Sequence, residues 1–185
     1  MNKISYRYDQ SAARLQIEGV PDFSQGHTKD VLGIISSWKL QFIGSPELEG
    51  KRDHLQAMMS IVLPYARHRL SGINRSFGHS SSPVSIAPNG NMHKLHLRSS
   101  QPGVEPLELN LDDAELSDLV RCLDSLRLDS RVQIPWDIPL DRPLSRSDLV
   151  GKLPLAKRFT APFAGGLIFI FSSLDKEKLL KYSII

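Results

Sequence analysis

Residues 107–128, LELNLDDAELSDLVRCLDSLRL, combine a strand pattern and a helix pattern in one short stretch. Leucines alternate with polar residues as far as Asp112, which is typical of a half-buried strand. Asp112 is also a suitable helix N-cap, with Glu115 three residues later. After this cap, apolar residues recur at helical spacing, at Leu116, Leu119, Val120, Leu123 and Leu126. We therefore predict a strand that leads directly into a capped amphipathic helix.

The same order of patterns occurs earlier in the chain, at an offset of 61 residues, with Glu47 matching Glu108. Residues 51–71 have the spacing of a helix, and Pro64 inside it predicts a kink. The apolar stripe of this helix consists of Leu55, Met58, Met59, Val62, Ala66 and Leu70. The chain thus has two similar halves, each a set of strands that ends in one helix.

The remaining strand signals are runs that alternate apolar and polar residues. The first two, KISYRYD (3–9) and ARLQIEG (13–19), are separated by a short polar turn that suits a hairpin. Similar runs follow at 37–44, 84–88, 93–99 and 106–112. We predict an α+β fold, a mainly antiparallel sheet with two helices on one face, because two amphipathic helices need a common apolar surface to cover. The other face of the sheet is then partly open.

Charge is unevenly divided along the 185 residues. The first 130 residues hold 14 Lys and Arg against 15 Asp and Glu, and the rest hold 9 against 5. Four prolines lie between residues 131 and 158, which favours an extended strap, docked through Trp136, Ile138 and Leu140. We predict an α+β domain, a Pro-rich basic linker, a candidate membrane segment and a charged tail, over 1–130, 131–158, 159–174 and 175–185 respectively.

The uncharged segment 159–174 could span a membrane, lie on its surface or pack in the core, and the sequence leaves these alternatives open. As a membrane helix it would measure about 24 Å, shorter than a hydrocarbon core of about 30 Å. Lys152, Lys157 and Arg158 precede it and would keep the domain on the cytoplasmic side. As a core strand, its LIFIF run has the expected β-branched and aromatic content.

The sequence offers little chemistry. It contains no Gly-rich phosphate loop, nucleophile elbow or HExxH zinc motif, so we expect no enzyme, cofactor, metal or small-molecule substrate. Cys122 is expected to be a buried structural cysteine, and His93 an ordinary strand histidine. Two sets of cations are candidate contacts for an anion or a partner: the strand face of Lys94, His96 and Arg98, and the helix end with Arg67 and Arg69. Solvated surface charge and helix-dipole pairing are the alternative roles of these sets.

Several segments together resemble a cyanobacterial protein family of unknown function. They include ISSWKLQFIGSPELEG (35–50), VLPYARHRLSG (62–72), HKLHLRSS (93–100) and the strand and helix of 107–128, within a span of roughly 13–145. The resemblance implies a soluble α+β domain, a basic linker and often a hydrophobic C-terminal segment. It implies no activity and no catalytic residue.

Two functions follow as expectations. The first is a non-enzymatic accessory or scaffold protein that is tethered to a membrane, with its domain in the cytosol. The second is a soluble, cytoplasmic module that binds protein or RNA through the open sheet face. Nucleic acid is the less expected partner, because the basic excess lies in the Pro-rich linker and few exposed aromatic residues accompany the cations.

Overall fold

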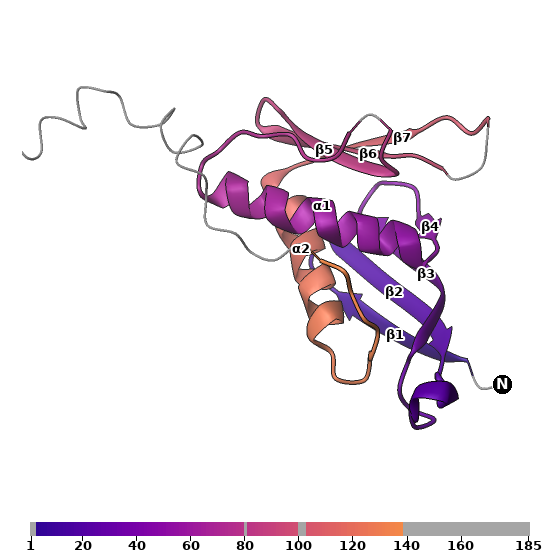
Figure 1. Cartoon of the computed structure of the whole chain (residues 1–185). Helices are drawn as coiled ribbons and strands as arrows, with labels where there is room; N and C mark the ends of the chain where they lie inside the picture. The colour runs from indigo at the N-terminus through magenta and orange to yellow at the C-terminus, as the bar shows by residue number, and fades with distance from the viewer. Residues whose placement is uncertain (1–2, 80, 100–102, 139–185) are drawn as a thin grey trace, which may run out of the picture. The chain divides into compact units, whose positions relative to one another are not determined.

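The computed structural model describes residues 3–79, 81–99 and 103–138, and it confirms an α+β fold with antiparallel strands (Figure 1). The strands form two sheets, with orders β1-β2-β3-β4 and β5-β6-β7. In chain order the elements are β1 (Ile4–Asp9), β2 (Ala13–Val20), the short 3-10 helix η1 (Phe23–Gln25), β3 (Ile34–Phe42), β4 (Leu48–Gly50), α1 (Arg52–Leu70), β5 (Val84–Asn89), β6 (Met92–Leu97), β7 (Leu107–Leu111) and α2 (Asp113–Leu128).

The two halves have the predicted similarity. Each is a sheet of antiparallel hairpins followed by a helix, and α1 and α2 begin 61 residues apart, at Arg52 and Asp113. Leu48 and Leu109, which match at this offset, are both buried. The strands separate into two sheets because α1 and the loop after it lie between β4 and β5 in the chain, so that no hairpin joins the halves.

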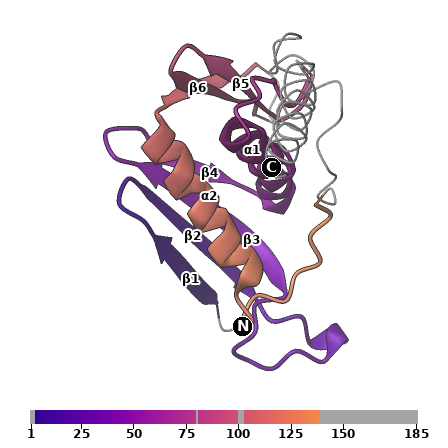
Figure 2. The same ribbon diagram turned by 90° about the vertical axis from the view of Figure 1, so that its left-hand side faces the viewer.

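The helices are exchanged between the halves. α1 packs mainly against β5 of the second sheet, and α2 packs mainly against β2 of the first sheet (Figures 1 and 2). The two helices also contact each other. Each sheet is therefore covered on one face by the helix of the other half, and the core is shared between the halves.

The helix stripes are confirmed except at one end of α1. Leu55, Met58, Met59, Val62 and Ala66 are buried, and α1 continues through Pro64. The prediction for Leu70 is wrong: this side chain is 91% exposed, because Leu70 is the last residue of the helix and lies beyond the buried part of the stripe. In α2 the predicted capping box is present: Asp112 accepts from the Glu115 amide, and Glu115 accepts from the Asp112 amide. Cys122 is buried, as expected.

The chain after α2 adds to the core. Val132 and Ile134 are buried, and Val132 forms a parallel bridge with Leu32. Trp136 and Ile138 pack against the core, as expected for the strap. Leu140, the rest of the basic linker, the uncharged segment 159–174 and the tail 175–185 lie outside the described residues. Among the residues that are described, neither helix combines the length and the hydropathy needed to cross a membrane.

Candidate functional site

The cations that the sequence singled out do not form one patch. Lys94 and His96 alternate with buried Leu95 and therefore lie on the outer face of the second sheet. Lys94 Nζ lies 2.7 Å from Glu108 Oε2 on β7. This hydrogen bond, followed by the charge of Lys94, holds the pKa of Glu108 below its usual value. The Lys94 charge is thus compensated within the sheet itself.

The other candidates lie elsewhere. Arg67 and Arg69 belong to the last turn of α1, which covers the inner face of the second sheet. The Arg69 guanidinium donates a 2.5 Å hydrogen bond to Asn74 Oδ1. Arg98 follows β6 directly and borders a pocket. The three linker cations Lys152, Lys157 and Arg158 fall outside the described residues.

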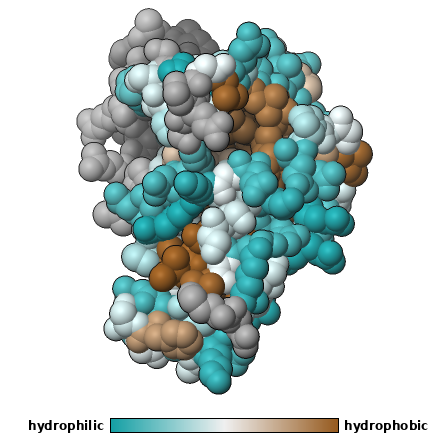
Figure 3. Space-filling model, turned by 90° about the vertical axis from the view of Figure 1, so that its right-hand side faces the viewer, coloured by the Kyte–Doolittle hydropathy of each residue, from teal (hydrophilic) through white to brown (hydrophobic). Residues whose placement is uncertain are grey.

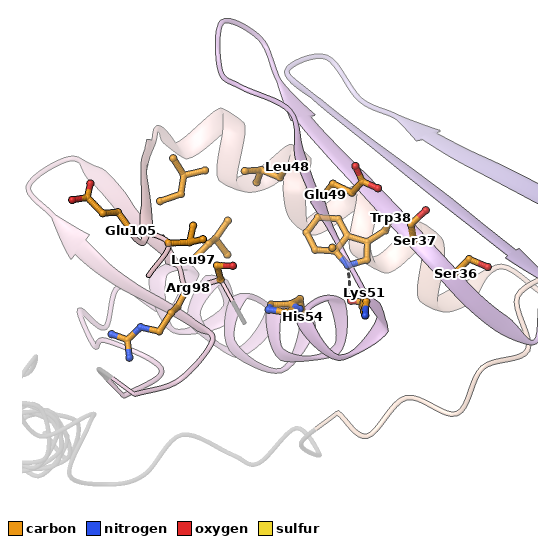
Figure 4. Close-up of a pocket in the computed structure, with 14 residues that line it drawn as sticks. Ser36, Ser37, Trp38, Leu48, Glu49, Lys51, His54, Leu97, Arg98 and Glu105 are labelled. Carbon is orange, nitrogen blue, oxygen red and sulfur yellow. Dashed lines mark hydrogen bonds between the residues drawn. The ribbon is translucent and has the colours of Figure 1, made fainter. Parts of the chain in front are cut away.

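The pocket beside Arg98 has a volume of about 420 Å³, within the range of small ligand sites. Its walls come from β3, β4, the start of α1, the end of β6 and the chain that leads into β7. Figure 4 shows Trp38 and Glu49 on one side, Leu97, Arg98 and Glu105 on the other, and His54 of α1 between them. We call this pocket the β4 groove. Its apolar lining residues are Trp38, Leu48, Leu97, Val104 and Leu107.

Trp38 is held in a fixed position at the groove. Its Nε1 donates a 2.8 Å hydrogen bond to the carbonyl of Lys51 (Figure 4). The indole ring lies against Gly50, where a Cβ atom would approach the ring carbons to 2.6 Å. Gly50 therefore has to remain a glycine for the ring to lie here, and the wall of the groove is rigid at this point.

The polar groups around the β4 groove differ from those on the sheet faces. Glu49, Lys51, Arg98 and Glu105 border the groove, and none forms an ion pair within the described part of the chain. In the same part of the chain, the buried Nδ1 atom of His54 has no hydrogen-bond partner. A buried polar atom without a partner is unusual in a folded protein.

The open face of the first sheet, by contrast, is internally compensated. Lys3 pairs with Glu18, Asp9 pairs with both Arg7 and Arg14, and Lys39 pairs with Glu47. Viewed from the right of Figure 1, the surface is mainly hydrophilic, with apolar side chains in a few small patches (Figure 3). The charges on this sheet face are thus already neutralised by neighbouring strands, which is typical of a solvated surface.

The sequence did not predict a chain of side-chain hydrogen bonds that runs from buried Tyr65 through buried His93 to Asp113. His93 is fully buried, with Nδ1 2.7 Å from the Tyr65 hydroxyl and Nε2 2.8 Å from Asp113 Oδ1. A neutral His93 fits both contacts, donating from Nε2 to the carboxylate and accepting from Tyr65. Burial raises the pKa of Tyr65, so its hydroxyl stays protonated as a donor. The alternation in HKLHL, which places His93 on the same face as Leu95, was the signal that could have revealed this inward position.

These three residues connect the two halves, since Tyr65 belongs to α1, His93 to β6 and Asp113 to α2. Tyr65 and His93 are inaccessible to a substrate, so the chain of hydrogen bonds acts as a structural joint. Burial likewise raises the pKa of the Cys122 thiol to about 11 and keeps it protonated. No group of three His, Cys, Asp or Glu side chains arranged for a metal ion occurs among the described residues.

Comparison with known protein families matches residues 6–174 to the domain of unknown function DUF4335. The chain belongs to this family. The match covers most of the sequence and confirms the resemblance to a family of unknown function. Comparisons with curated proteins and with solved structures find no match. In this DUF4335 domain, the β4 groove brings together an apolar lining and charged side chains that form no ion pair within the described residues.

Proposed function

We propose that this DUF4335 protein is a non-enzymatic accessory protein that holds a segment of a partner polypeptide in the β4 groove. The observation that carries the proposal is the contrast in charge pairing. Charged side chains on the sheet faces are paired with one another, whereas Glu49, Lys51, Arg98 and Glu105 surround an apolar lining without ion-pair partners in the described chain. An apolar centre with a polar, accessible rim is the usual anatomy of a protein-binding surface.

The groove is a better contact surface than the open sheet face on which the sequence analysis focused. A partner bound on the first sheet would have to displace existing ion pairs such as that of Lys39 with Glu47, at 2.7 Å. In the groove, a partner meets half-buried Leu97 and Leu107 and the half-exposed side chain of Val104. Binding there removes apolar surface from water without breaking a contact of the folded domain.

A selection from a random library of displayed 12-residue peptides tests this proposal, with the full chain as bait. We expect enriched peptides that bind the wild type and lose binding to Val104→Asp, which places a charge in the groove. Ile43→Asp is the matched control, because Ile43 is also an exposed apolar residue but lies outside the groove. Enriched peptides that bind both variants equally well, or no enrichment at all, would contradict a polypeptide-binding groove.

A second candidate function, tethering to a membrane, is supported by the sequence after residue 138. Lys152, Lys157 and Arg158 precede the uncharged segment 159–174, and basic residues beside an apolar segment favour a membrane surface. Tethering and peptide binding are compatible, because the groove lies in residues 36–107. On this proposal the protein presents its groove to partners on the cytoplasmic side of the membrane.

Vesicle flotation tests the tether. The full chain and a 1–158 truncation are mixed with vesicles of neutral lipid and of one-third anionic lipid. We expect the full chain to float with both and to resist a carbonate wash, and the truncation to stay at the bottom with neutral vesicles. If the full chain remains in the soluble fraction with both kinds of vesicle, the tether is excluded.

A further inference from the structure

The strand that borders the β4 groove has an unusual edge. β4 pairs with β3 and has no second strand partner in the described chain. β5 also lies at the edge of its sheet, but Phe77 covers it with two backbone hydrogen bonds to Ile86, of 2.8 and 2.9 Å. The outer edge of β4 instead faces the groove, since Leu48, Glu49 and Gly50 all line it. A strand edge that is open beside an apolar pocket is a template for adding another strand.

We propose that the β4 groove accepts an extended segment of a partner protein as a fifth strand on β4, with the side-chain order apolar–basic–apolar. The inference rests on the proposed function, and it specifies the conformation and chemistry of the bound segment. The side chains of β4 alternate between the two faces of the sheet, with Leu48 buried and Glu49 exposed. A neighbouring strand places its own side chains in the same alternation, so β4 dictates the order.

The two apolar positions follow from the inner face of β4. A segment paired with β4 directs one side chain toward the sheet interior beside Leu48 and another beside Gly50. Gly50 has no side chain, and the fixed indole ring of Trp38 lies against it. The indole ring occupies the space above Gly50. A large apolar or aromatic side chain opposite Gly50 would therefore contact Trp38 and the leucines across the groove.

The basic position follows from Glu49. Acidic side chains on the other edge strands are compensated within their own sheets: Asp9 of β1 by Arg7 and Arg14, and Glu108 of β7 by Lys94. Glu49 lies directly opposite Lys39 in the register of β3 and β4, and its charge contributes to the raised pKa of Lys39. The Lys39 ammonium, however, forms its 2.7 Å ion pair with Glu47, and Glu49 has no ion pair of its own among the described residues. A Lys or Arg opposite Glu49 on an added strand would give it such a pair on its open side.

The test uses the full chain and fluorescein-labelled nine-residue peptides whose central residues are Ile-Lys-Phe, Ile-Glu-Phe or Ser-Lys-Ser. Binding is measured by fluorescence anisotropy. We expect the dissociation constant of Ile-Lys-Phe to be about fivefold or more lower than that of Ile-Glu-Phe. This ratio corresponds to replacing a cross-strand attraction with Glu49 by a repulsion. Ser-Lys-Ser should bind more weakly still, because it removes the apolar contacts.

A charge swap makes the test specific to β4. Glu49→Lys should reverse the preference, so that Ile-Glu-Phe becomes the tighter peptide. Glu18→Lys is the matched control, because it makes the same charge change on β2, which β3 separates from β4, and should leave the preference unchanged. Equal affinities for the Lys and Glu peptides, or a reversal by Glu18→Lys, would overturn the inference.

Hydrogen exchange then tests strand addition directly. On binding Ile-Lys-Phe, the amides within residues 48–50 that point away from β3 should become protected. Those of residues 4–9 on the opposite edge strand β1 should not change. Peptides N-methylated at alternate positions should lose binding only where the methylated nitrogen faces β4. Library peptides that bind the groove without protecting β4 would overturn strand addition and leave the proposed function standing. The absence of any groove-binding peptide, designed or selected, would contradict both.

Discussion

The two halves of the domain follow the same plan, yet they begin their helices differently. α2 begins at a complete capping box formed by Asp112 and Glu115, and its first residue, Asp113, binds His93. α1 begins after Lys51, whose side chain makes no capping hydrogen bond. The uncapped helix start is also the one that borders the β4 groove. In the second half, the polar side chains at the helix start make the capping box and the contact to His93. In the first half, Lys51 makes no capping contact, and Arg52 instead donates a hydrogen bond to the carbonyl of Pro135.

The difference extends to the helix ends. The C-cap residue of α2, Asp129, accepts three hydrogen bonds from Arg131, two from the guanidinium and one from the backbone amide. It accepts a fourth from the Tyr8 hydroxyl of β1. At the C-cap of α1, the backbone N–H of Ser71 donates to the carbonyls of Arg67 and Arg69 and closes the last turn. Both ends of α2 thus connect to other elements through side chains. We infer that the second half supplies the polar contacts that hold the halves together.

The largest expected effect concerns the joint between the halves. His93→Ala should lower the free energy of unfolding by about 3 kcal/mol, because it leaves the buried Tyr65 hydroxyl without a partner and creates a cavity. Urea unfolding at pH 7 measures this loss. Asp113→Asn is the control, since Asp113 is 81% exposed and an amide oxygen still accepts from Nε2, so its effect should be below about 1 kcal/mol. A loss below 1 kcal/mol for His93→Ala would show that the joint contributes little.

The second prediction concerns the C-terminal end of α2 and its response to pH. The hydrogen bonds from Arg131 hold the pKa of Asp129 at about 2, below its usual 3.8. Because the folded value is lower than the unfolded value, the stabilisation is complete above about pH 5. It is lost progressively as the pH falls through 3.8 toward 2. It amounts to about 1–2 kcal/mol for this largely buried carboxylate.

Asp129→Asn should remove that part of the pH dependence. Urea midpoints of both proteins between pH 5 and 2 give the comparison. The difference between wild type and variant should shrink as the pH falls, since the wild-type Asp129 becomes protonated. A difference that is constant with pH would show that Asp129 contributes nothing through its charge.

The third prediction concerns the cap itself. Asp112→Ala should destabilise the protein by about 1 kcal/mol, because the amide of Glu115 loses its acceptor. Asp112→Asn keeps an accepting side-chain oxygen and should recover most of the loss. Thermal and urea unfolding of the three proteins measure the effect. If Asn and Ala destabilise equally, then the charge at the helix start, and not the hydrogen bond, is the stabilising term.

Sequence patterns predicted the elements of this fold well because their causes are local. The alternation of leucines before Asp112 and the capping box both depend on neighbours a few residues apart. The exchange of helices was not predicted. Helical spacing shows which face of α1 is apolar, but β5, which this face covers, is chosen by the path of the whole chain.

The candidate site was predicted less well, because it also depends on contacts between segments that are far apart in the sequence. Arg98 was selected for its strand face and does border the groove, but Trp38 and His54 were read as parts of a strand and a helix. Their meeting depends on contacts between β3, α1 and the end of β6, which are up to 60 residues apart. A local pattern carries no signal for such a pocket, whereas the absence of an ion-pair partner becomes visible once the strands are paired.

The smallest expected effect concerns the N-terminus of α1, which has no side-chain cap, in contrast to that of α2. The backbone of Lys51 is extended, with φ −97° and ψ 170°, the conformation that an N-cap requires. Lys51→Ser should therefore supply the missing cap and stabilise the protein by about 0.5 kcal/mol. Lys51→Ala is the matched control, because it removes the same charge without offering an acceptor. A higher urea midpoint for Lys51→Ser than for Lys51→Ala would show that α1 can be capped as α2 is. The natural sequence would then lack this stability at the start of the groove. Equal midpoints would mean that the amides at the start of α1 already have hydrogen-bond acceptors.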